Sequence, residues 1–290
     1  MNWERDGRDW PNRASSRFVR AGGLRWHVQV LGQGPVVLLL HGTGASTHSF
    51  RALAPMLATD FTVVAPDLPG HGFTASPTRA SGYSLVAVAN GIDAMLRELG
   101  LRPALAVGHS AGAAIAVHMT LQGAIEPIAV VSLAGALLPF PGMANDFFGP
   151  AARFLASSTV TAKAFALFAG SRPSVERMMR STGSIIDPEG MRLYSRLAGN
   201  SGHVHGALSL MANWDLRPLQ RDMPVLRCRL VLVTGSRDGM VPPAEAHRVR
   251  ALVPTAELVS LRGSGHLAHE ERPAEIAALL RPLVPHEAAG

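Results

Sequence analysis

Short, continuously apolar segments rich in β-branched residues recur along the chain, and segments with helical apolar spacing lie between most of them. Segments that are apolar on both faces are typical of parallel strands covered by helices on both sides of a sheet. We therefore predict an α/β fold with a mostly parallel, doubly wound sheet. The predicted central strands are Val36–Leu40, Phe61–Ala65, Ala104–Val107, Ile128–Leu133 and Leu230–Val233.

The remaining elements follow from turn signals and from apolar periodicity. Gly22 and Gly23 separate two alternating segments, Phe18–Ala21 and Leu24–Leu31, and this pattern predicts an antiparallel hairpin ahead of the central strands. Apolar residues spaced three and four apart predict the crossover helices. The predicted helices are Ser46–Leu57, Leu85–Leu99, Ala111–Leu121, Pro243–Leu252 and Ala274–Leu283, and a last strand is predicted at Ala256–Leu261.

The regular alternation of strands and helices is interrupted once, between about Ala136 and Arg217. This part of the chain contains Pro and Gly breaks and helical stretches such as Ala151–Phe168. We therefore predict a core formed by residues 1–135 and 218–290, with residues 136–217 inserted as a helical lid. The Met and Phe side chains of the insertion are expected mainly to pack within the lid, and they would also suit a flat or apolar substrate.

Composition excludes several classes of function. The net charge is +6, but the basic residues are scattered, without a run of five like charges, so we expect no nucleic-acid partner. Cys228 is the only cysteine, which excludes an intramolecular disulfide. His203 and His205 are not accompanied by a third ligand at suitable spacing, so we expect neither a metal nor another cofactor.

Two long segments without charged residues, Pro103–Ile125 and Pro127–Asn145, could be mistaken for membrane spans. The first contains two histidines around a glycine-rich turn, and Pro and Gly break the second, so we expect no transmembrane segment. Contact with the surface of a membrane remains an alternative. The polar, charged residues near Met1 do not resemble a secretory signal, so a cytoplasmic location is expected.

The segment Gly108-His-Ser-Ala-Gly112 follows the predicted strand Ala104–Val107 and opens the predicted helix Ala111–Leu121. A Gly-x-Ser-x-Gly sequence between a strand and a helix is typical of a nucleophile elbow. The turn is so sharp that side chains two residues before and after the serine would clash, and glycine removes that clash. Ser110 is therefore the candidate nucleophile.

A serine hydroxyl needs a base, and the base needs an orienting carboxylate. Asp238 comes just after the strand Leu230–Val233, and His266 follows the strand Ala256–Leu261. Taken singly, these residues could be a loop cap and a surface histidine. Their order after the serine, each past a separate strand, is the order found in α/β hydrolases and predicts a triad. His269 is the alternative base.

Acyl transfer also requires two hydrogen-bond donors for the negative oxygen that develops on the substrate. The backbone amide of Ala111, directly after the serine, is expected to be one donor. The segment from His41 to Ser46 follows the strand Val36–Leu40, and we choose the Thr43 amide as the second donor. Gly42 would permit the close approach.

With these motifs, the chain from about Phe18 to Leu283 resembles α/β hydrolases of the esterase, C–C hydrolase and dehalogenase branch. Segments without a generic role resemble, more closely, the magnesium-chelatase accessory (BchO) family of photosynthetic bacteria. That resemblance implies a role in bacteriochlorophyll and tetrapyrrole biosynthesis, with a tetrapyrrole as possible substrate and magnesium-chelatase subunits as possible partners. The segments are Asp9–Arg13, Gly22–Val28, His41–Ser49, Met211–Pro218 and Gly265–Pro273.

These features favour a serine hydrolase, most simply an esterase, that acts on a small molecule of the tetrapyrrole pathway. The alternative is a non-catalytic accessory protein that binds a porphyrin or a chelatase subunit on a hydrolase fold. A lipase-like enzyme unrelated to pigments is a third hypothesis, which rests on the generic motifs alone. Lys163 is the only lysine and no nucleotide-binding loop surrounds it, so the chain is not an ATP-driven subunit.

Overall fold

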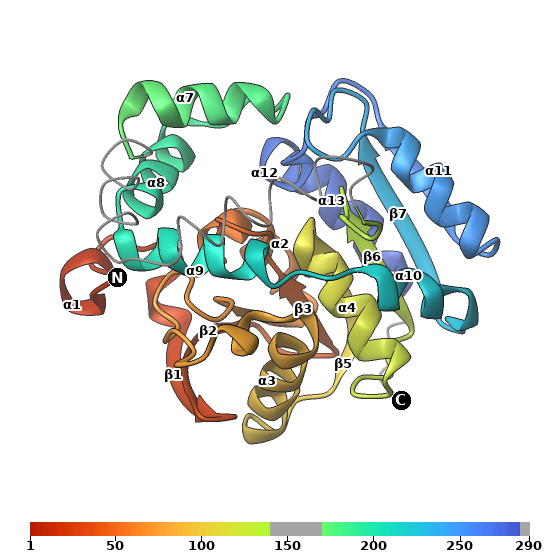
Figure 1. Ribbon diagram of the computed structural model, residues 1–290, viewed down its shortest axis with the longest axis horizontal. Helices are drawn as coiled ribbons and strands as arrows, with labels where there is room; N and C mark the ends of the chain where they lie inside the picture. Colours follow the sequence, from red (N-terminus) through yellow and green to blue (C-terminus); the bar gives the residue numbers. More distant parts are fainter. Residues whose placement is uncertain (140–169, 285–290) are drawn as a thin grey trace.

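An eight-stranded sheet forms the centre of the computed structural model, which describes residues 1–139 and 170–284 (Figure 1). The strand order is β1-β2-β4-β3-β5-β6-β7-β8. β2 is antiparallel to β1 and β4, and the strands from β4 onward in that order are parallel, as predicted. The strands are β1 Ser16–Ala21, β2 Leu24–Leu31, β3 Val36–Leu40, β4 Thr62–Pro66, β5 Pro103–His109, β6 Ala129–Leu133, β7 Arg229–Gly235 and β8 Glu257–Leu261.

Helices cover both faces of this sheet. α3, α4, α10 and α11 contribute to the apolar cluster on one face, and α2 and α13 contribute to the cluster on the other (Figure 1). The helices are α1 Trp3–Asp6, α2 Leu53–Leu57, α3 Leu85–Glu98, α4 Ala111–Leu121, α7 Arg172–Ser181, α8 Pro188–Ala198, α9 Ser201–Ala212, α10 Arg217–Asp222, α11 Pro243–Leu252, α12 Ala268–Glu271 and α13 Pro273–Leu280.

Strand β3 shows why the sequence requires two helical layers. Its side chains alternate between the faces of the sheet. Leu38 and Leu40 pack in the cluster with α3 and α4, whereas Val37 and Leu39 pack in the cluster with α2 and α13. All four side chains are fully buried. A strand of this composition is therefore stable only between two layers of helices.

The hairpin at the edge of the sheet agrees with the prediction. Ala21 pairs with Leu24 at the end of the β1–β2 ladder. The turn between them has φ of 55° at Gly22 and 77° at Gly23, in the left-handed region that glycine enters without steric cost. The alternating pattern thus predicts the two strands, and the two glycines predict the turn between them.

The prediction of one helix over Ser46–Leu57 is wrong. The structure has a 3₁₀ helix at Thr47–Phe50 and then the short helix α2, Leu53–Leu57. Pro55 explains the break, because it has no N–H to donate to the Arg51 carbonyl and its ring would clash with that carbonyl in a continuous helix. The irregular segment before α2 contributes side chains to the interior near the candidate site.

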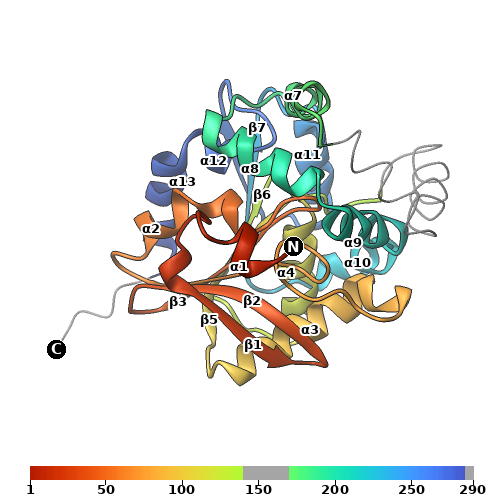
Figure 2. The same ribbon diagram turned by 90° about the vertical axis from the view of Figure 1, so that its left-hand side faces the viewer.

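The predicted helix Ala151–Phe168 lies outside the described residues, but three helices of the proposed insertion, α7, α8 and α9, are described. Helix α8 begins at Pro188, and the Asp187 side chain caps it by accepting a hydrogen bond from the Gly190 amide. The segment containing α1 packs beside α8, where Asp9 pairs with Arg192 and Arg196 (Figure 2). The N-terminal arm therefore ties α8 to the core.

The apolar segment Pro103–Ile125 folds as β5, the elbow and α4. Within residues 1–139 and 170–284, no helix combines the length and the apolar character that a membrane span requires.

Candidate active site

Ser110 occupies a strained turn between β5 and α4. Its φ and ψ are 51° and −116°, a combination that is unusual for a residue with a side chain. The turn leaves no room for flanking side chains: a Cβ at Gly108 would lie 2.3 Å from the Ala113 nitrogen, and one at Gly112 would lie 2.1 Å from the Leu40 carbonyl oxygen. The Ser110 amide donates a hydrogen bond to the Leu133 carbonyl over 3.0 Å. The hydroxyl is thereby presented at the carboxyl ends of the central strands.

Asp238 and His266 meet at the same edge of the sheet, after β7 and β8. The His266 Nδ1 lies 2.9 Å from the Asp238 Oδ2. The other carboxylate oxygen accepts hydrogen bonds from the amides of Met240, at 2.8 Å, and Val241, at 2.9 Å. Both side chains are buried, so these three N–H groups replace the water that an ionised carboxylate would otherwise bind.

The alternative base, His269, has different partners. It is buried, and its Nε2 donates a hydrogen bond to the Ser49 hydroxyl over 2.8 Å. Burial lowers the pKa of the His269 imidazole to about 3. The carboxylate of Asp238 contacts His266 and not His269.

His109 joins the elbow to the loop that carries His266, and no sequence motif marks it as a site residue. Its Nε2 donates a hydrogen bond to the His266 carbonyl oxygen over 3.1 Å, and the two ring centroids are 4.7 Å apart. His109 is buried, and its desolvation lowers the imidazole pKa well below the ordinary value. His109 therefore links the Ser110 turn to the loop that carries His266.

The loop after β3 approaches Ser110 closely. A Cβ on Gly42 would lie 2.9 Å from the Ser110 Cβ. His41 fixes this loop, because its Nδ1 donates to the Gly42 carbonyl and its Nε2 accepts from the Leu68 amide. Thr43, the predicted source of one oxyanion donor, is partly exposed next to this contact.

Ala111, the predicted source of the second donor, is the first residue of α4. The first amides of a helix have no partner within the helix, and they lie at its partially positive end. Among the residues that the structure describes, neither the Thr43 amide nor the Ala111 amide donates a hydrogen bond.

His203 connects α9 to residues 41–46 after β3, the candidate oxyanion loop. Its Nε2 donates to the Gly44 carbonyl over 3.0 Å, and its Nδ1 accepts from the Gly72 amide over 3.1 Å. Within the described ranges, His, Cys, Asp and Glu side chains do not gather in threes at a place that could hold a metal ion. The bridging role of His203 can be recognised only in the tertiary structure.

Asp67 stabilises the turns near the site. Its fully buried carboxylate accepts hydrogen bonds from the His27 Nδ1 and the Thr47 amide, both at 2.7 Å, and from the Phe73 amide at 2.9 Å. Burial alone would raise its pKa, but His27 and the other donors outweigh burial and hold the pKa well below the usual range. Asp67 thus connects strand β2 to the segments that carry Thr47 and Phe73.

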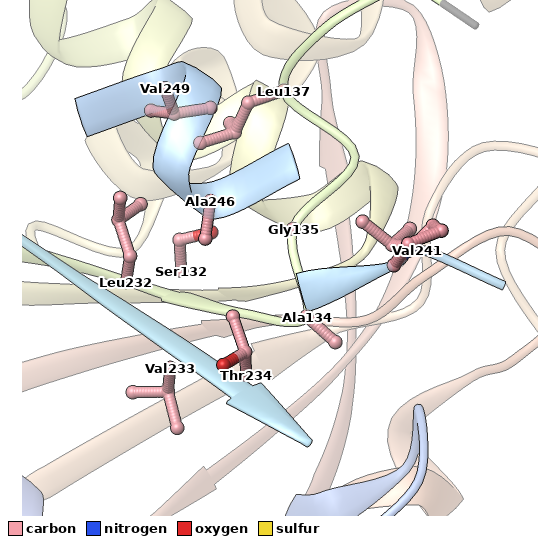
Figure 3. Close-up of a pocket in the computed structure, with 11 residues that line it drawn as sticks. Ser132, Ala134, Gly135, Leu137, Leu232, Val233, Thr234, Val241, Ala246 and Val249 are labelled. Carbon is pink, nitrogen blue, oxygen red and sulfur yellow. The ribbon is translucent and has the colours of Figure 1, made fainter. Parts of the chain in front are cut away.

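A small cavity lies between the ends of β6 and β7 and helix α11 (Figure 3). Ala134, Leu137 and Val249 form part of its mainly apolar wall, and Val241, whose amide binds Asp238, lies at one side. It has room for little more than a water molecule. This cavity is too small for a substrate of the size of an ester.

Comparison with known proteins places these features in context. Residues 35–273 match the family model described as alpha/beta hydrolase fold. A protein of Rhodobacter capsulatus named magnesium-chelatase 30 kDa subunit is 38% identical over 264 residues, which are 90% of this chain and 92% of the relative. A pimeloyl-[acyl-carrier protein] methyl ester esterase of Xanthomonas campestris is 27% identical over 86% of this chain and 96% of its own length.

Solved structures share the architecture at lower sequence identity. A serine hydrolase involved in carbazole degradation superimposes with a TM-score of 0.74 at 20% identity, covering 92% of this chain and 97% of the other. A putative lipase from Acinetobacter baumannii gives a TM-score of 0.77 at 18% identity, with coverage of 97% and 95%. These two structures support the fold alone.

Proposed function

The chain belongs to the alpha/beta hydrolase fold family and is a relative of the magnesium-chelatase 30 kDa subunit, and from this we propose that it is a serine hydrolase. Ser110 is the nucleophile, His266 the base and Asp238 the acid of this proposal. The observation that carries it is the 2.9 Å contact between His266 and Asp238 beside the strained Ser110 turn.

In the proposed mechanism, Asp238 holds the proton of His266 on Nδ1, so that Nε2 is free to act as the base. His266 takes the hydroxyl proton of Ser110 while the serine oxygen attacks the substrate carbonyl carbon. The carbonyl oxygen becomes negative and is bound by the amides of Thr43 and Ala111. His266 then protonates the leaving group, and water hydrolyses the acyl-enzyme by the same steps.

The proposed substrate is a carboxylic ester or related acyl compound of tetrapyrrole metabolism. Two relatives support this choice: one carries the name of a magnesium-chelatase subunit, and the other is named a methyl ester esterase. We accordingly place the reaction in bacteriochlorophyll biosynthesis, near magnesium insertion, with magnesium-chelatase subunits as possible partners.

The test is hydrolysis of a simple aryl ester, p-nitrophenyl butyrate, and of the methyl esters of protoporphyrin IX and of its magnesium complex. Wild-type protein should release nitrophenol from the first and free carboxylate from at least one tetrapyrrole ester. Ser110→Ala should release neither. Hydrolysis of the aryl ester without any tetrapyrrole ester would support the chemistry and reject the substrate class.

A non-catalytic accessory role is the second candidate, because the relative with 38% identity is named as a chelatase subunit and not as a hydrolase. Under this hypothesis, a tetrapyrrole binds without turnover, and Ser110→Ala binds it as well as wild type does. A magnesium-insertion assay with purified chelatase separates the two hypotheses, since only the accessory role predicts full stimulation by Ser110→Ala.

A further inference from the structure

Glu270 is a fully buried carboxylate four residues after His266, and it contacts two other parts of the chain. Its Oε1 accepts hydrogen bonds from the Ser49 hydroxyl at 2.6 Å and from the Tyr194 hydroxyl at 2.7 Å. Its Oε2 is paired with the Arg51 guanidinium. Ser49 in turn accepts the hydrogen bond from His269, on the same short helix as Glu270.

The contact with Tyr194 links Glu270 to helix α8 of the insertion. Tyr194 also packs edge-on against His48 of the segment after the oxyanion loop, with ring centroids 4.5 Å apart. Arg51 makes a second link, because its other nitrogen binds Asp187, the residue that caps the start of α8, over 2.8 Å. Helix α8 is thus anchored to Arg51 at its start and to Glu270 at its middle.

The segment between α7 and α8 binds the histidine loop itself. The His266 amide donates to the Thr182 carbonyl over 2.9 Å, and the Leu267 amide donates to the Ser184 hydroxyl over 2.8 Å. Nearby, Glu271 accepts hydrogen bonds from the amides of Ile185 and Gly265. The backbone on both sides of the His266 side chain is therefore held by residues of the insertion.

From these contacts we propose that Glu270 is a positioning residue that fixes the His266 loop to α8 and to the segment following the oxyanion loop. This inference rests on the proposed function in one respect: His266 is taken to be the base. The described part of the insertion then acts as a fixed support for the base, since displacing α7 and α8 would break the bonds to the His266 and Leu267 amides.

The chemistry of the cluster fits a positioning role. The cluster consists of Glu270, Ser49, Arg51 and Tyr194. A buried carboxylate with three donors has one favourable orientation, and loss of a donor weakens the restraint on that orientation. Ser49 and Arg51 flank Phe50, which lies in the core, so the cluster cannot shift without moving the packed segment. Small displacements of a catalytic base are costly, because a shift of about 1 Å can reduce a rate on the order of 100-fold.

The first test uses Tyr194→Phe, which removes one hydroxyl and retains the ring packed on His48. Ser195→Ala is the matched control, since the Ser195 hydroxyl on the same helix binds the Met191 carbonyl and no other group of the described residues. With p-nitrophenyl butyrate, Tyr194→Phe should lower kcat about 5- to 50-fold at nearly constant KM, and Glu270→Gln should lower it further. Unchanged kcat in both variants would overturn the proposal.

The second test does not depend on catalysis. Hydrogen–deuterium exchange of residues 263–272 reports whether α8 and the histidine loop are coupled. Tyr194→Phe and Glu270→Gln should accelerate exchange in this segment at least several-fold, whereas Ser195→Ala should not. If the wild type hydrolyses no ester, the proposed function fails, and exchange alone decides whether Glu270 positions the loop. If all three variants exchange at the wild-type rate, the positioning role is rejected.

Discussion

The imidazole of His266 and the carboxylate of Asp238 are held 2.9 Å apart although 28 residues separate them in the sequence. Their loops follow the adjacent parallel strands β7 and β8, whose carboxyl ends lie at the same edge of the sheet. The register of these two strands therefore sets the distance between Asp238 and His266. The elbow after β5 presents Ser110 at the same edge.

Replacing Asp238 with Asn should keep the fold and remove most activity. The Asn oxygen can still accept from the amides of Met240 and Val241, but its NH₂ group would face the His266 Nδ1 and favour the wrong tautomer. We expect turnover to fall by about three to four orders of magnitude, with little change in Tm. Ester hydrolysis and thermal unfolding measure both, and an unchanged rate would move the acid to another residue.

Adding a methyl group at Gly42 should impair the site directly. The new Cβ would lie 2.9 Å from both the His109 Nδ1 and the Ser110 Cβ, so either the loop or the nucleophile must shift. We predict that Gly42→Ala loses about 1–3 kcal/mol of stability and at least tenfold in kcat.

Gly100→Ala provides the control, because its φ of 67° imposes backbone strain while the added Cβ meets no atom within 4 Å. It should be destabilised without losing kcat. If the two variants lose activity equally, the close approach of Gly42 to Ser110 has no special importance.

Buried histidines should make the fold sensitive to acid. Burial lowers the pKa of His203 to about 4 and that of His269 to about 3, against about 6.5 in an unfolded chain. Between pH 6.5 and 4 the unfolded state binds protons that the folded state does not, so stability falls as the pH falls. Each such histidine contributes about 1.4 kcal/mol per pH unit across its window.

His203→Gln tests this linkage while retaining a donor for the Gly44 carbonyl. Urea unfolding at several values between pH 7 and pH 5 should give a weaker pH dependence for His203→Gln than for wild type, by about one proton. His247→Gln, at an exposed position of α11, serves as the comparison. Parallel curves for wild type and His203→Gln would contradict the assignment of a neutral, buried His203.

Much of the core could be predicted from the sequence, because buried parallel strands and crossover helices have local signatures. Val36–Leu40, Ala111–Leu121 and Pro243–Leu252 have the same bounds in the structure as in the prediction. The prediction failed at Ser46–Leu57, where apolar spacing indicated a helix but Pro55 excludes a continuous one.

The candidate site, like the core, could be predicted from the sequence only in part. Ser110, Asp238 and His266 were selected from local motifs and strand order. The supporting contacts were not, because the Ser49–Glu270 pair spans 221 positions and the His109–His266 pair spans 157. No sequence spacing predicts either contact, because both contacts depend on how distant loops pack. The role of His203 likewise became visible only once α9 was placed beside Gly44.

The most direct test of the central claim is covalent labelling of the purified protein with a fluorophosphonate, followed by mass spectrometry of its peptides. The reagent reacts with a serine only when a base activates the hydroxyl and donors bind the phosphonyl oxygen. We predict one phosphonyl adduct, located on Ser110, that is absent in Ser110→Ala and formed far more slowly in Asp238→Asn. Absence of any adduct on wild type, or the same adduct on Ser110→Ala, would contradict the assignment of Ser110 as the nucleophile.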